Sequence, residues 1–252
     1  WLAFILVIEP DEKISRETFH EHVLQIIRWA QDRARYLPDK IHYVFSMSHL
    51  RTVAETAGRG NTFAMWFLAA TFVYNIGAVG FFTITPVFLV KRLGMSGTLI
   101  FGLAFIQAIA STLLFKYFGR FSDRGNKPNL LFLSKCSRAL IFGLYIVALP
   151  LVEVNAFGGV CFLICLHISL GITWAIIADT QLPIAVSGCS NDKKGSHAGM
   201  FNAVVGLGTI AGGAIGGIVA TAMGFGPSII LCSLIVLLSA AVMRLAVAKS
   251  SA

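Results

Sequence analysis

Long apolar segments alternate with short charged ones along most of this chain. A helix needs about 20 apolar residues to cross the hydrocarbon core of a bilayer. The apolar runs are continuous rather than alternating, which favours spanning helices over the strands of a barrel. We therefore expect an all-α membrane protein with transmembrane helices at residues 63–90, 97–118, 129–149, 156–178, 198–222 and 227–247.

The first 61 residues differ from the rest. Residues 1–8 are apolar but stop at Glu9-Pro10, too few to cross a membrane, so we interpret them as the end of one more helix in a fragment of a longer protein. Residues 9–61 carry eight of the 12 acidic residues. Apolar residues at helical spacing from Phe19 to Ala34 predict an amphipathic helix within a cytoplasmic connector. A regulatory site in this region is the alternative interpretation.

Composition and charge fit this picture. The chain is 56% hydrophobic and 13% charged, against about 25% charged residues in a soluble domain. The net charge is +8, and of the 20 basic residues only Lys91 and Arg92 would lie outside. This positive-inside bias predicts a multi-pass protein of the plasma (inner) membrane with its C-terminus in the cytoplasm. Because no basic, aromatic-lined groove accompanies the charge, we expect no nucleic-acid partner.

A charged island, residues 119–128 (GRFSDRGNKP), separates two of the apolar segments. It resembles the loop signature of the major facilitator superfamily, G-x-L-a-D-R-x-G-R-K. Phe121 and Asn126 depart from that pattern. The matching residues are Gly119, Asp123, Arg124, Gly125 and Lys127.

The resemblance implies a fold and an activity for essentially the whole chain. Residues 1–8 would end helix 6, and residues 62–252 would form helices 7–12, the six-helix C-terminal half of a twelve-helix fold built from inverted three-helix repeats. No such repeat is visible in the sequence. The family consists largely of secondary active transporters that move a small solute by alternating access. The missing N-terminal half, the lipid bilayer and a small-molecule substrate would be the partners, with proton or ion coupling. The resemblance also implies that the island forms a tight turn and that Asp123 contacts the start of helix 11, near Ser196.

Polar residues inside the spans are the candidate substrate contacts, because each is costly in lipid unless it has a partner. Asn75, Gln107, His167 and Trp174 are the cavity candidates, since the family resemblance places the helices of Asn75, His167 and Trp174 beside the cavity. His167 could bind a substrate group or carry a proton. The alternative roles are interhelical hydrogen bonds for Asn75, Gln107 and His167, and packing without substrate contact for Trp174.

Two further features lie within the spans. Lys135 and Arg138 follow Pro128 closely, so their long side chains are expected to snorkel to the inner boundary, or else to pair with Asp123 or Asp179. Gly208, Gly212 and Gly216 recur at four-residue spacing, which predicts a close helix–helix contact.

Other classes of function were weighed against the transporter. A transport-inactive sensor or scaffold would act through residues 9–61. A membrane-embedded enzyme is disfavoured because no nucleophile–base pair and no H-E-x-x-H motif occurs, so we expect no enzymatic activity. The five cysteines lack His or carboxylate partners, and we expect no metal and no cofactor.

Overall fold

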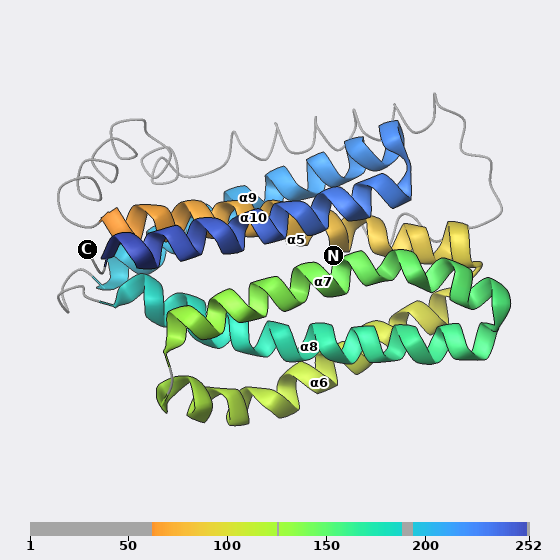
Figure 1. The fold of residues 1–252 in the computed structure, drawn as a ribbon, viewed down its shortest axis with the longest axis horizontal. Coiled ribbons are helices and arrows are strands. Elements are labelled where there is room, and N and C mark those ends of the chain that lie inside the picture. The colour runs from red at the N-terminus through yellow and green to blue at the C-terminus, as the bar shows by residue number, and fades with distance from the viewer. Residues whose placement is uncertain (1–61, 125, 188–193, 251–252) are drawn as a thin grey trace, which may run out of the picture. The chain divides into compact units, whose positions relative to one another are not determined.

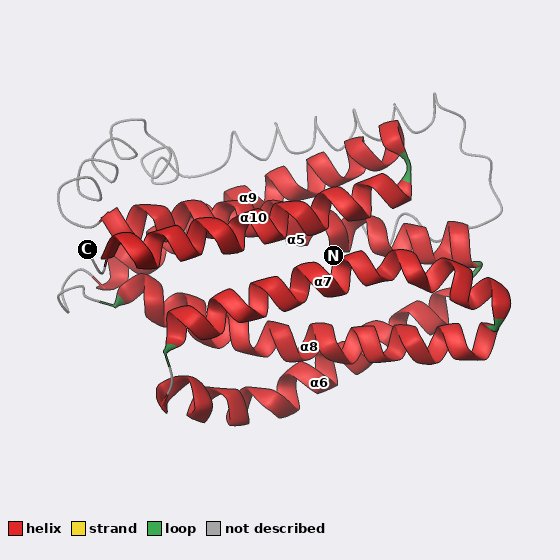
Figure 2. Ribbon diagram, in the orientation of Figure 1, coloured by secondary structure: helices red, strands yellow, loops and turns green. Residues whose placement is uncertain are grey.

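The computed structural model describes residues 62–124, 126–187 and 194–250, which belong to one compact unit. These residues form six helices, each long and apolar enough to cross a membrane (Figure 2). The predicted all-α membrane fold is therefore confirmed at this level. The predictions for residues 1–8 and 9–61, and for Gly125, lie outside the described residues. The helices are α5 (Thr62–Leu93), α6 (Gly97–Arg124), α7 (Lys127–Val154), α8 (Ala156–Val186), α9 (Lys194–Met223) and α10 (Phe225–Ser250).

Two glycines end helices on one side of the bundle. Gly94 (φ 61°) follows α5 and its N–H donates to the Val90 carbonyl, while Gly224 (φ 83°) follows α9 and donates to Ala220. A left-handed residue at this position satisfies a carbonyl that the helix leaves free, and glycine adopts it without strain. A single residue therefore separates α9 from α10, and Pro227 lies inside the first turn of α10.

The turn at the charged island is shorter than predicted. We expected a loop over residues 119–128, but α6 continues through Arg124 and α7 begins at Lys127. The Asn126 side chain caps α7 by accepting from the Asn129 N–H, and Pro128 lies in the first turn, where no N–H is needed. Gly119 is accordingly a helical residue rather than part of a turn.

The outer loop predicted after residue 149 is also shorter. Helix α7 includes Pro150 and ends at Val154, and Asn155 alone links it to α8. The Asn155 N–H donates to the Leu151 carbonyl, while its side chain accepts from the Gly158 N–H. Asn155 thus caps both the C-terminus of α7 and the N-terminus of α8.

The helices form two three-helix layers (Figure 1). In one layer α5 packs between α9 and α10, and in the other α8 packs between α6 and α7; contacts between α7 and α10 join the layers. The first three helices (α5–α7) and the last three (α8–α10) form two three-helix units, in which α5 corresponds to α8, α6 to α9 and α7 to α10. The main packing partners of each helix match those of its counterpart. Because α5 and α8 run in opposite directions, the two units are related by inversion of topology.

Glycines stand at both equivalent crossings. A Cβ added at Gly208, Gly212 or Gly216 of α9 would come within 3.0 Å of atoms of α5, most of them backbone. At the other crossing, a Cβ on Gly171 of α8 would lie 2.5 Å from the Gln107 carbonyl oxygen of α6. Small residues let helix backbones approach this closely in lipid.

Candidate functional site

The buried face of α7 carries two basic residues in the interior of the bundle. Lys135 is 0% exposed and Arg138 is 1% exposed. Arg138 lies about 4 Å along the axis from the midpoint of α7, at 1.5 Å per residue, so it is deep within the span. The prediction that these side chains snorkel to the inner boundary is wrong, because both are enclosed by neighbouring helices. The alternative pairing with Asp179 is also absent, since neither residue makes an ion pair within the described part of the chain.

Aromatic rings from three helices surround the Arg138 guanidinium. Its Cζ lies 5.3 Å from the ring centroid of Phe82 on α5, 5.9 Å from Phe142 on α7 and 5.5 Å from Trp174 on α8. Each such cation–π contact stabilises a cation by about 0.5–2 kcal/mol. The effective cost of burying an unpaired ion is several kcal/mol. The rings therefore offset only part of that cost.

The polar atoms at this point lack acceptors. Arg138 Nε and Nη1 and the Tyr74 hydroxyl make no hydrogen bond of 3.5 Å or less among the described residues. The guanidinium and the hydroxyl lie close enough to form only a longer, weaker one with each other. Leaving a buried donor unsatisfied costs about 1–3 kcal/mol, and more when the group is charged. Natural bundles retain such a group in lipid mainly where it has a functional role.

Lys135 extends the same cluster. Its Nζ lies 3.5 Å from the Ala70 carbonyl oxygen of α5 and 5.1 Å from the centroid of the Tyr74 ring. One carbonyl at the limit of hydrogen-bond distance satisfies little of an ammonium group, which has three donors. Tyr74 therefore lies between two basic groups. We call Tyr74, Lys135 and Arg138 the donor cluster.

His167 on α8 contacts the other end of this face of α7. Its Nδ1 lies 2.9 Å from the Leu163 carbonyl oxygen, and since a carbonyl only accepts, the proton belongs on Nδ1. The Tyr145 hydroxyl, 3.4 Å from Nε2 and 3.1 Å from Nδ1, is then the donor available to Nε2. His167 is buried, so its contacts match the alternative of a hydrogen-bonded interhelical residue.

The other predicted cavity residues occupy different places. The Asn75 side chain donates to the Thr71 carbonyl of its own helix at 2.8 Å and packs where α9 crosses α5. Gln107 lies at the crossing of α6 and α8. Trp174 is 43% exposed and covers Arg138. Of the four candidates, the structure brings Trp174 and His167 to α7, whereas Asn75 and Gln107 lie at helix crossings.

The signature residues lie at one end of α6 and the start of α7. A Cβ added at Gly119 would lie 3.6 Å from an Asp179 carboxylate oxygen, so α6 and α8 are close here. The side chains of Asp123 and Arg124 are outside the described residues, and the predicted contact between Asp123 and the start of α9 stays a prediction. Lys127 opens α7, next to the Asn126 cap.

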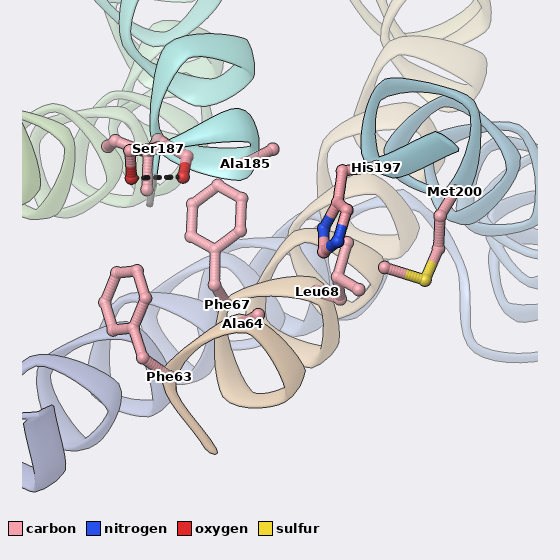
Figure 3. Close-up of a pocket in the computed structure, with 9 residues that line it drawn as sticks. Phe63, Ala64, Phe67, Leu68, Ala185, Ser187, His197 and Met200 are labelled. Carbon is pink, nitrogen blue, oxygen red and sulfur yellow. Dashed lines mark hydrogen bonds between the residues drawn. The ribbon is translucent and has the colours of Figure 1, made fainter. Parts of the chain in front are cut away.

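A small pocket opens where α5 and α9 begin and α8 ends (Figure 3). Phe63 and Phe67 of α5 form one wall, and the His197 ring and Met200 of α9 form another, with Ser187 opposite. Its volume is about 20 Å³, which holds one water molecule but no solute.

The described residues hold no group of three His, Cys, Asp or Glu side chains that could bind a metal ion. Comparisons of this chain with known protein families, with curated proteins and with solved structures find no match.

Proposed function

We propose that this chain is part of a secondary active transporter that moves a small solute across the membrane by alternating access. The observation that carries the proposal is Arg138, a guanidinium deep within a transmembrane helix with no counter-charge among the described residues. A buried ion persists when something charged or polar meets it during function. A passing solute is such a group, and it would meet Arg138 in only part of a transport cycle.

The arrangement of the helices supports the proposal. Two inverted three-helix units, each with its first helix central to a layer, are the architecture that the resemblance of the charged island implies. In that architecture this unit is the C-terminal half of a major facilitator, and a second six-helix bundle faces it. Arg138 then lies between α5 and α8, the two central helices, where both contribute rings to its surroundings.

The other features of the proposal follow from charge and size. The basic island and the basic end of α10 belong on the cytoplasmic side of a plasma membrane, with the C-terminus inside. This chain contains no nucleotide-binding loop, and we infer that the energy comes from the gradient of a proton, an ion or the substrate itself.

The proposal is tested by counterflow in liposomes containing the purified full-length protein, that is, this chain together with the second six-helix bundle. Liposomes preloaded with an unlabelled solute should take up the same labelled solute faster than empty ones, for at least one of glucose, choline, lactate and inorganic phosphate. Such trans-stimulation requires a site that faces the two sides in turn. Arg138→Gln should abolish it, whereas Arg244→Gln, at an exposed arginine of α10, should not. Absence of counterflow for all four solutes would favour the sensor or scaffold.

A further inference from the structure

We propose that the transported solute bears an oxyanion, a carboxylate or a phosphate, and that the donor cluster of Tyr74, Lys135 and Arg138 binds it. The inference rests on the proposed function and adds the chemical class of the substrate. It starts from a surplus of donors that the described residues leave without acceptors.

The chemistry of the cluster selects an acceptor with negative charge. Arginine offers five N–H donors in a planar fork and lysine offers three, and neither side chain can accept. Within the described residues, Arg138 Nε and Nη1 have no acceptor within 3.5 Å, and the Tyr74 hydroxyl makes only a weak contact with the guanidinium. Lys135 has one acceptor at 3.5 Å. Two oxygens of one carboxylate or phosphate match the arginine fork and leave lone pairs for a third donor.

The carboxylates within the described side chains lie elsewhere. Glu153 is exposed at the far end of α7, and Asp179 lies beside Gly119 near the end of α6. Neither pairs with Arg138 or Lys135. The counter-charge must therefore come from outside this set of residues, and a bound solute supplies it.

Trp174 marks the route by which an anion reaches the cluster. Of the three rings within 6 Å of the guanidinium, Phe142 is buried, Phe82 is partly buried and Trp174 is 43% exposed. Trp174 is thus the most exposed of the three rings, and Arg138 is least deeply enclosed on its side. We infer that Trp174 covers the site in the state seen here.

Binding is measured first as thermal stabilisation of the full-length protein, with both helix bundles present, purified in dodecylmaltoside without added anionic lipid. A ligand that binds only the folded state raises its unfolding temperature. Lactate and inorganic phosphate are the anionic probes, and glucose and choline are the neutral and cationic ones. We expect a rise of about 2 °C or more with at least one anion, and none with glucose or choline. A response to lactate alone assigns a carboxylate, and a response to phosphate alone assigns a phosphate.

Three substitutions separate binding from support of the fold. Arg138→Gln and Arg138→Met should abolish the anion response and weaken anion binding by about 30-fold or more, because they remove one partner of a buried charge pair. Arg138→Lys keeps the charge but loses the fork, and should retain a reduced response. Without anion, Arg138→Met should unfold at no lower temperature than the parent, since it removes an uncompensated buried ion. Arg244→Gln is the matched control and should leave the response intact.

The inference is overturned by an anion response that survives in Arg138→Met, or by responses to glucose and choline that equal the response to the anions. A marked loss of stability in Arg138→Met, together with no anion response in the parent, would assign Arg138 to a carboxylate of another helix bundle, which also contradicts the inference. Counterflow of glucose or choline without any effect of anions would leave the transporter proposal standing and refute this one. An Arg138-dependent anion response without counterflow of any solute would support the anion site and refute the transporter proposal.

Discussion

Replacing Gly212 by alanine tests the close contact between α9 and α5. The added Cβ would lie 2.7 Å from the Ile76 carbonyl oxygen, 2.9 Å from the Asn75 carbonyl oxygen and 3.0 Å from Ile76 Cα. All three are backbone atoms of α5, so no side chain can rotate away to make room. The helices α5 and α9 must separate instead.

The size of the effect follows from the distances. Ordinary contact begins at 3.4 Å, so the Ile76 oxygen must move by about 0.7 Å, the difference between 3.4 and 2.7 Å. A gap of 0.5–1 Å forfeits about a quarter to a half of each van der Waals well along the crossing. Overpacking of this kind costs about 1–3 kcal/mol, while Gly→Ala in a helix by itself gains up to about 1 kcal/mol. Gly217→Ala is the matched control on the same helix, because a Cβ there meets nothing within 4 Å.

We expect Gly212→Ala to be less stable than Gly217→Ala by about 1–3 kcal/mol, the overpacking cost that the control does not share. The free energy of unfolding is measured for both variants by titrating mixed micelles with sodium dodecyl sulfate and following helical circular dichroism. Equal stabilities would mean that α9 does not approach α5 closely in the membrane, and the two-layer arrangement would then be wrong at this crossing.

Two further substitutions probe the layer around α8. Gly171→Ala should destabilise the bundle by about 1–3 kcal/mol in the same titration, because its Cβ would press on the Gln107 carbonyl, whereas Gly102→Ala on α6 meets nothing and should not; similar values for both would place the crossing elsewhere. Tyr145→Phe should cost about 0.5–1.5 kcal/mol by removing the hydroxyl that contacts His167, and the loss should disappear in a His167→Leu background. A loss that persists in that background would show that the hydroxyl acts on another group.

The spans could be predicted from the sequence because crossing a bilayer sets a length and an apolar composition that are properties of consecutive residues. Each of the six predicted segments lies largely within one observed helix. The turns could not be predicted equally well, because a helix ends where its last carbonyls find donors. Asn155 alone caps both of its neighbouring helices. The charges of residues 119–128 likewise do not predict that α6 continues through Arg124. The predicted span ends at residue 149, just before Pro150, but α7 accommodates this proline in its last turns.

The inverted arrangement of the two three-helix units was not detectable by inspection of the sequence. What the units share is which helix packs on which, and many apolar side chains can fill the same interhelical space. The two close crossings also differ in their glycines: three glycines of α9 lie against α5, whereas one glycine of α8 lies against α6. A repeat of packing therefore survives without a repeat of residues.

The distance of Arg138 from Pro128 along the chain predicts snorkelling, but its direction around α7 decides where the side chain lies. Phe142 and Tyr145 follow it at i+4 and i+7, so the guanidinium shares a face with two aromatic residues that are fully buried. The opposite face carries Leu133 and Leu140, which are exposed as lipid-facing aliphatic residues should be. A basic residue in register with buried rings has no path along its own helix to the headgroups, and its charge must be met inside the protein. The sequence contains this periodicity. It leads to the same conclusion as the burial of Arg138, namely that the guanidinium needs a counter-charge inside the protein.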